Sequence, residues 1–165
     1  GAGPMLHRTR TLAFALTAAC TASALAADLA VPYPKGYRDW THVKSMVINP
    51  GHPLHEAFGG IHPLYANDKA LRGYRTGRFP DGAVIVFDLL DAKTADNTVQ
   101  EGPRKVVGVM HRDSRRHAAT GGWGYEGFKG DSTTERAVGA NAATACHACH
   151  EAQKDKGYVF STYRR

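Results

Sequence analysis

Five residues near the C-terminus, Cys146-His147-Ala148-Cys149-His150, constrain this chain more than any other stretch. The C-x-x-C-H spacing places two thiols three positions apart on a helical turn and a histidine directly after the second thiol. This pattern attaches a c-type haem: each thiol forms a thioether with a haem vinyl group, and the histidine nitrogen binds the iron. We therefore predict one covalently attached haem c, with Cys146 and Cys149 as anchors and His150 as the iron ligand.

Two closely spaced cysteines have three other interpretations. A thioredoxin-like redox pair is expected in a βαβ context, which the surrounding sequence does not show. A structural zinc ion needs four nitrogen or sulfur ligands, and only His147 or a distant histidine is available to complete that set. Two incidental cysteines are the third interpretation. Haem is favoured because the N-terminus predicts export, which agrees with covalent haem attachment.

The N-terminal segment has the organisation of a secretory signal peptide. Residues 1–4 precede a methionine and are typical of residues left by cloning. Arg8 and Arg10 form a short basic region ahead of an apolar stretch from Leu12 to Leu25, and Ala24-Leu25-Ala26 matches a cleavage site. The apolar stretch is too short and too rich in Thr and Ser for a membrane-spanning helix.

We expect residues 1–26 to be removed on export to the periplasm and residues 27–165 to form a single haem domain with one core. Only the two cysteines of the haem motif then remain, so the mature chain is no disulfide scaffold. A lipoprotein would use Cys20 as the lipidated residue. That alternative is less favoured because Thr17, rather than leucine, lies three positions before it.

The positive charge of the chain is best explained as a solvated surface. The formal net charge of +6 falls by two when the leader and its two arginines are removed. No cluster of Lys and Arg with interleaved aromatic residues stands out, so a nucleic-acid partner is not expected. Membrane association after cleavage of the signal peptide is not expected either.

Hydrophobic patterns and turn signals predict an α+β fold, a mainly antiparallel β-sheet with a few short helices. Four strands are expected, over residues 43–48, 83–87, 106–110 and 121–128. A short helix is expected between a cap at Asn67 and an end at Gly77, and residues 51–63 and 91–104 are expected to be loops. A C-terminal helix capped by Asn141 is expected to carry the haem motif to about residue 156, before a last strand or tail.

Several motifs occur in order along the mature chain. They are Tyr37-Arg38-Asp39-Trp40, Phe58-Gly59-Gly60-Ile61-His62, Tyr65-Ala66-Asn67, residues 79–87, residues 118–124 and the terminal Cys146-His147-Ala148-Cys149-His150. This order resembles the cytochrome P-460 family, and within it the cytochrome c′-beta branch. The resemblance implies a mainly antiparallel β fold, usually a homodimer, and a five-coordinate haem held by the proximal histidine.

Two positions differ from the members of that family that oxidise hydroxylamine. In those enzymes a lysine on the strand after the F-x-D-G turn cross-links to the haem edge, whereas this chain has Phe87 there and its next lysine is Lys93. Their acidic residue ahead of the Gly-x-Trp segment is replaced by Ala118-Ala119-Thr120. The resemblance to the c′-beta branch implies instead that Phe58 and Phe87 cap the distal haem face.

Three further residues have more than one interpretation. His62 lies near the haem and hydrogen-bonds a ligand or a propionate in one interpretation, and is a turn histidine beside Pro63 in the other, which is favoured. Met110 or His111 would be the sixth ligand of an electron carrier. Met110 is better explained as a core residue, because it lies in an apolar run.

These features favour a gas-binding haem protein over an efficient enzyme. An open iron under an apolar face binds nitric oxide or carbon monoxide without the hydrogen bond that dioxygen requires. The expected use is scavenging, sensing or slow redox turnover of reactive nitrogen species, with a periplasmic redox partner. One alternative is a hydroxylamine or nitric oxide oxidoreductase of the cytochrome P-460 type, and a second is a six-coordinate electron-transfer cytochrome.

Overall fold

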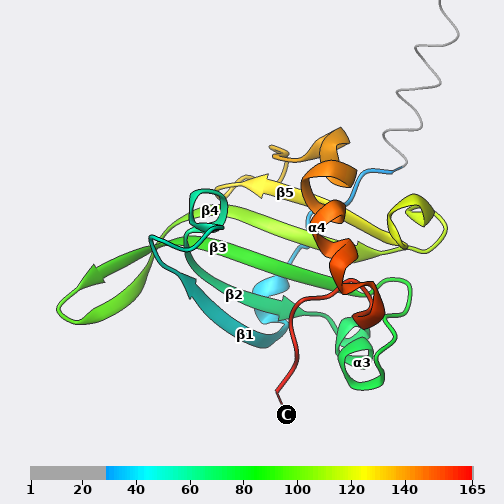
Figure 1. The fold of residues 1–165 in the computed structure, drawn as a ribbon, viewed down its shortest axis with the longest axis horizontal. Helices are drawn as coiled ribbons and strands as arrows, with labels where there is room; N and C mark the ends of the chain where they lie inside the picture. Colours follow the sequence, from blue (N-terminus) through cyan, green and yellow to red (C-terminus); the bar gives the residue numbers. More distant parts are fainter. Residues whose placement is uncertain (1–28, 165) are drawn as a thin grey trace, which may run out of the picture.

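The computed structural model describes residues 29–164, which form a five-stranded sheet with the strand order β1-β2-β3-β4-β5 (Figure 1). All neighbouring strands are antiparallel. The strands are β1 (Thr41–Ile48), β2 (Gly60–Ala66), β3 (Val84–Ala95), β4 (Thr98–Arg112) and β5 (Trp123–Lys129). Because spatial neighbours are also neighbours in sequence, the sheet is a simple meander. The predicted leader and Cys20 lie outside the described residues.

The helices are short and lie at the ends of strands or after the last strand. The α-helices are α2 (His55–Phe58), α3 (Asp68–Thr76) and α4 (Ala148–His150). The 3-10 helices are η1 (Tyr37–Asp39), η2 (Ala118–Thr120), η3 (Gly139–Asn141) and η5 (Glu151–Lys156), and η4 (Ala143–His147) is a π-helix. The predicted α+β class with a mainly antiparallel sheet is confirmed. Within residues 29–164, no helix is both long and apolar enough to cross a membrane.

Helix α3 begins and ends where the sequence predicts. The Asn67 side chain accepts a hydrogen bond from the Ala70 N–H at 2.9 Å and another from the Val84 N–H at 3.0 Å. Gly77 ends the helix in the left-handed conformation, with a φ of 76°. Asn67 therefore caps α3 and also ties it to the start of β3.

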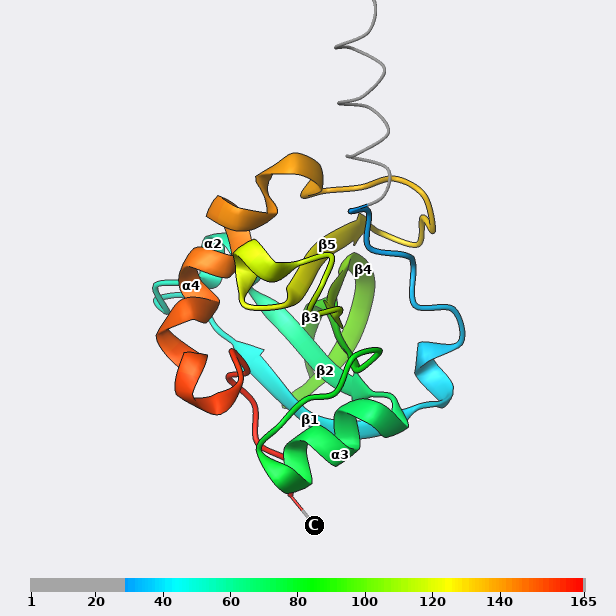
Figure 2. The same ribbon diagram turned by 90° about the vertical axis from the view of Figure 1, so that its right-hand side faces the viewer.

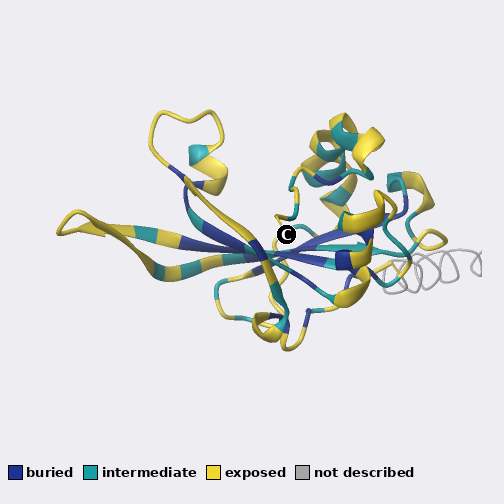
Figure 3. Cartoon of the chain, turned by 90° about the horizontal axis from the view of Figure 1, so that it is seen from below, coloured by how far each residue is buried: buried dark blue, intermediate teal, exposed yellow. Residues whose placement is uncertain are grey.

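The prediction of a loop over residues 91–104 is wrong. These residues belong to a long hairpin of β3 and β4 that turns at Asp96 and Asn97, whose φ values are 50° and 57°. Positive φ at both central residues matches the twist of a two-residue hairpin, and Asp and Asn tolerate it better than most residues. The strands are polar here because the hairpin projects from the body of the protein and is exposed (Figure 3).

The prediction of a loop over residues 51–63 is also wrong in part, because these residues include α2 and the first half of β2. Pro63 favoured a loop over a strand, because proline cannot donate a ladder hydrogen bond and is rare inside sheets. The pairs between β2 and β3 run from Ile61 with Leu90 to Leu64 with Phe87, without a pair at positions 62 and 63. The sheet thus accommodates Pro63 in an inner strand.

The C-terminal helical segment exists but differs from the predicted regular helix. It consists of the consecutive pieces η3, η4, α4 and η5. The Asn141 side chain is not the predicted cap; the Asn141 backbone carbonyl accepts a hydrogen bond from Thr144 Oγ1 at 3.2 Å. Residues 159–160 follow as an extended tail rather than a strand.

Both faces of the sheet are covered, each by a different part of the chain (Figure 2). We call the motif face the one that carries Leu64, Ile85, Phe87 and Tyr125, against which α3 and the C-terminal segment pack. The opposite face carries Val86, Val107 and Phe128, and the N-terminal segment packs against it through Val31 and Tyr37. Helices α2 and α4 both rise from the motif face.

A buried carboxylate holds the N-terminal segment to the opposite face. Asp88 is 1% exposed and accepts hydrogen bonds from the Tyr37 hydroxyl at 2.7 Å and from Arg104 Nε at 2.6 Å. The Arg104 guanidinium also contacts the exposed Asp131. Removing one member of a buried ion pair leaves the other charge without a partner, which costs far more than losing an exposed pair.

We predict that Asp88→Asn lowers the free energy of unfolding by about 3 kcal/mol, because Arg104 then lacks its buried counterion. Urea unfolding of the purified protein measures this loss. Glu135→Gln is the control, since Glu135 pairs with Lys129 at 2.9 Å on the exposed surface and its loss is expected to cost less than about 1 kcal/mol. Equal losses in the two variants would contradict the role given to Asp88.

Candidate haem site

The C-terminal helical segment presents both cysteines of the motif as free thiols. Cys146 lies on η4, is half-buried and packs against the apolar cluster of the motif face. Cys149 lies on α4 and is exposed. The backbone is helical throughout this stretch, so residues three and four positions apart lie on one side. Cys146, Cys149 and His150 therefore project from the same side of one rigid segment.

His150 is oriented by a hydrogen bond between its ring and the backbone. Its Nδ1 lies 2.7 Å from the Tyr158 carbonyl oxygen, and because a carbonyl only accepts, Nδ1 carries the proton. Burial lowers the pKa of His150, although the hydrogen bond to Tyr158 opposes this shift. The ring is therefore neutral at pH 7 and leaves the Nε2 lone pair available to a metal.

The turn after η5 aims the Tyr158 carbonyl at His150. Gly157 and Tyr158 both have left-handed backbone conformations, with φ values of 68° and 67°. The Tyr158 N–H donates to the Gln153 carbonyl at 2.8 Å, and Trp123 Nε1 donates to the Gly157 carbonyl at 2.9 Å. These bonds fix the turn against β5, although a left-handed tyrosine is itself unfavourable.

Aromatic rings flank His150. The Tyr125 ring lies 5.1 Å and the Phe160 ring 5.0 Å from the imidazole, measured between ring centroids. Tyr125 is buried on β5, whereas Phe160 is 57% exposed on the C-terminal tail. The predicted iron ligand is thus held by one hydrogen bond and two aromatic contacts.

The two phenylalanines predicted to form a cap lie against each other. Phe87 is half-buried on the motif face of β3, and Phe58 is 40% exposed at the end of α2. Their ring centroids are 5.8 Å apart and their planes meet at 84°, an edge-to-face pair. Helix α2 thus brings the Phe58 ring over the middle of the sheet.

His62 joins this aromatic pair. It lies on β2, is 4% exposed, and its ring centroid is 4.4 Å from that of Phe87. The interpretation of His62 as a turn histidine is wrong, because residues 60–66 form a strand. The structure therefore brings the two predicted cap residues, Phe58 and Phe87, into one cluster with His62, in agreement with the less favoured interpretation that His62 lies near them.

Phe87 lies where the resemblance stated above would place a cross-linking lysine. The next lysine along β3, Lys93, is exposed and pairs with Gln100 near the hairpin tip. Six residues of strand separate it from Phe87, a distance of about 20 Å. Lys93 therefore cannot replace the missing lysine.

The two residues considered as sixth ligands lie on opposite faces of β4. Met110 pairs with Ile85 and Tyr125 and packs against the cluster that also contacts Cys146. His111, one position on, points to the other face, and burial lowers its pKa. Met110 is thus a core residue, as the sequence predicts, and His111 does not share a face with His150.

A buried glutamate, which the sequence analysis missed, positions the chain just before the haem motif. Glu126 of β5 accepts hydrogen bonds from the N–H groups of Gly127, Val138 and Gly139 at 2.8, 3.0 and 3.1 Å. Arg136 Nη1 also donates to it at 2.9 Å. The sequence signal was an acidic residue inside an otherwise apolar and glycine-rich strand.

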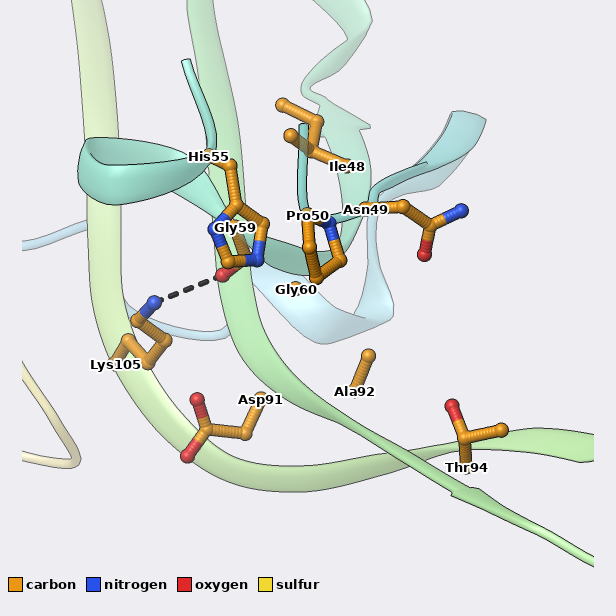
Figure 4. Close-up of a pocket in the computed structure, with 10 residues that line it drawn as sticks. All are labelled: Ile48, Asn49, Pro50, His55, Gly59, Gly60, Asp91, Ala92, Thr94 and Lys105. Carbon is orange, nitrogen blue, oxygen red and sulfur yellow. Dashed lines mark hydrogen bonds between the residues drawn. The ribbon is translucent and has the colours of Figure 1, made fainter. Parts of the chain in front are cut away.

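A separate pocket of about 310 Å³ lies beside α2, which contributes His55 to its lining (Figure 4). Lys105 closes one side of it by donating from Nζ to the Gly59 carbonyl at 2.8 Å. His55 and Asp91 contribute polar groups to its wall. It contains none of the predicted site residues, so the chemistry of the motif is located on the motif face and not in this pocket.

The residues of the motif face fit a haem in three respects. His150 offers a neutral nitrogen, and two free thiols project beside it. The apolar rings of Phe58, Phe87 and Phe160 suit a flat macrocycle. The buried Tyr125 hydroxyl and His147 Nδ1 have no hydrogen-bond partner in the described chain, as polar groups beside a bound cofactor would. No group of three or more His, Cys, Asp or Glu gathers within residues 29–164 to hold a metal ion.

A family model described as Cytochrome P460 matches residues 34–161. A comparison with curated proteins finds no match. The matched range contains all six predicted site residues, which are Phe58, His62, Phe87, Cys146, Cys149 and His150.

Glu126 generates a prediction about pH. Burial alone would raise the pKa of this carboxyl, but the hydrogen bonds from Gly127, Arg136, Gly139 and Val138 outweigh it and lower the pKa. A lowered native pKa stabilises the fold above the unfolded pKa of about 4.3, and this contribution is lost as the pH falls through the native value.

We therefore expect Glu126→Gln to be less stable than the wild type by about 2 kcal/mol at pH 7, with a smaller difference at pH 3. Urea unfolding at the two pH values measures this convergence. The exposed Glu101→Gln is the control and is expected to match the wild type at both. A difference that stays constant with pH would show that the Glu126 charge contributes nothing.

Proposed function

The chain belongs to the cytochrome P460 family, and we propose that it binds nitric oxide or carbon monoxide at a five-coordinate haem iron. Membership makes it a c-type haem protein. The single observation that carries the proposal is the edge-to-face pair of Phe58 and Phe87. Phe87 lies on the same face of the sheet as Tyr125, which contacts His150. The bound haem would supply an iron that takes one diatomic ligand.

Cys146 and Cys149 are proposed to attach the haem. Each thiol adds across one vinyl double bond: the sulfur bonds to one carbon and the thiol hydrogen goes to the other, so no oxidant is needed. The helical segment holds both thiols on one side, and Cys146 is the more buried of the two. The two bonds would fix the haem edge against η4 and α4.

We propose that His150 would be the only side chain of the protein to hold the haem iron. Its Nδ1–H is held by the Tyr158 carbonyl, which fixes both the tautomer and the ring orientation. A hydrogen bond at this nitrogen makes the other one a better donor to iron. The Tyr125 and Phe160 rings limit rotation of the imidazole.

Phe58 and Phe87 are proposed to cap the other haem face. Their rings carry no hydrogen-bond donor, so they favour ligands that bind ferrous iron without one. Nitric oxide and carbon monoxide bind ferrous iron without requiring a donor from these rings. The rings also crowd the site and would slow ligand access. These features match what the cytochrome c′-beta branch implies.

The two alternative functions have less support. An oxidoreductase of the P-460 type needs a lysine or a distal acid–base group, and Phe87 occupies the lysine position. A six-coordinate electron carrier needs a sixth ligand, and Met110 is packed in the core while His111 points to the other face.

We also propose export to the periplasm, a homodimer and use in scavenging, sensing or slow redox of reactive nitrogen species with a redox partner.

Covalent attachment predicts that haem stays with the chain on denaturation. In a peroxidase-stained denaturing gel, the wild-type band is expected to stain, and Cys146→Ala with Cys149→Ala is expected to lose the stain. Each single variant keeps one thioether and shifts the reduced pyridine spectrum. Staining of the double variant equal to that of the wild type would contradict the assignment.

The cap predicts faster ligand binding once it is opened. In ferrous Phe87→Ala, carbon monoxide is expected to associate about tenfold faster than in the wild type, equivalent to about 1.4 kcal/mol of barrier. Rapid mixing under carbon monoxide measures the rate. Val99→Ala is the control, because Val99 is exposed on the β3–β4 hairpin where it pairs with Thr94, away from the motif residues, and no change is expected.

Phe87→Leu retains a large side chain if Phe87→Ala folds poorly, and is expected to give a smaller acceleration. An unchanged rate in both Phe87 variants would show that this ring does not cover the iron. Failure of the wild type to bind either gas would contradict the proposed function itself.

A further inference from the structure

The cluster beside the cap contains one polar ring that the proposed function does not use. His62 alternates along β2 with Leu64 and Ala66, so its side chain lies on the motif face. Leu64 packs against the same cluster as Cys146. His62 therefore lies on the side of the sheet where the haem is proposed to bind.

The His62 imidazole is buried without a partner for one of its nitrogens. The side chain is 4% exposed, and its Nδ1 has no hydrogen-bond partner in the described part of the chain. A buried polar atom without a partner destabilises the fold, and a leucine or phenylalanine would fill the same space without that cost. Packing therefore does not explain a histidine here.

The position of the ring relative to the cap suggests what it does. Its centroid lies 4.4 Å from that of Phe87, with a tilt of 37° between the planes, and Phe58 contacts the same Phe87 ring edge to face. Burial lowers the pKa of His62, so the ring is neutral and carries one N–H and one lone pair. It is the polar end of an otherwise apolar row of rings.

We propose that His62 is the hydrogen-bond donor of the distal pocket, a specificity-determining residue that acts on the ligand beside the Phe87 ring. This inference rests on the proposed function and names its ligand class: small nitrogen oxides whose outer atom gains negative charge on binding. Such ligands are stabilised by a donor, whereas carbon monoxide is nearly indifferent to it. The cap would then restrict access, and His62 would discriminate among the ligands that enter.

The infrared stretch of carbon monoxide bound to the ferrous holoprotein tests this directly. A nearby N–H draws electrons onto the carbon monoxide oxygen and lowers the C–O frequency. We expect His62→Leu to raise the frequency and to abolish its shift in heavy water. His62→Gln keeps a donor and is expected to fall between the two. His42→Leu is the matched control, since His42 is exposed on β1 and should have no effect.

Nitric oxide dissociation gives a second readout. Loss of one hydrogen bond is expected to speed dissociation from ferrous His62→Leu by roughly tenfold. Thermal unfolding controls for packing, because removal of the unpaired imidazole should leave the midpoint equal or higher.

Two results separate the inference from its premise. If carbon monoxide binds but its frequency is the same in wild type, His62→Leu and His62→Gln, the donor role is wrong while the open iron stands. If no gas binds to the wild type, the proposed function fails first.

Discussion

The hydrogen bond from His150 Nδ1 to the Tyr158 carbonyl is the contact on which the proposed site depends. It decides which imidazole nitrogen is free and which way that nitrogen points. The carbonyl is in place only because the turn at Gly157 and Tyr158 is held against β5 by Trp123. The orientation of the proposed iron ligand is therefore set by contacts with the edge strand β5 and not by the short helix that carries the motif.

Two buried carboxylates stabilise the parts of the chain that have little regular structure. Asp88 binds Tyr37 and fixes the N-terminal segment on one face, and Glu126 binds the N–H groups ahead of η3 and so fixes the approach to the haem motif. Phe87 lies in β3 on the motif face, where α2 places Phe58 against it. The helices of this protein are short. Hydrogen bonds to the two buried carboxylates hold these irregular segments in place instead.

The features predicted correctly from the sequence are those that local chemistry determines. The cap at Asn67 and the end at Gly77 define α3 as predicted, and the family match agrees with a haem protein. The polar β3–β4 hairpin and the first half of β2 were missed, because an exposed strand lacks apolar alternation and Pro63 is atypical of an inner strand. The contact of His62 with Phe87 depends on strand register, and the contact of Phe58 with Phe87 depends on the path of α2. A single sequence specifies neither.

The central claim is an iron with one protein ligand beneath an aromatic cap. The spin state of the dithionite-reduced holoprotein, measured by magnetic circular dichroism before any gas is added, tests it most directly. A high-spin ferrous signal is predicted, because His150 alone donates and Phe87 and Phe58 cannot. A low-spin signal would mean that a second side chain binds the iron, and would contradict both the open site and the cap.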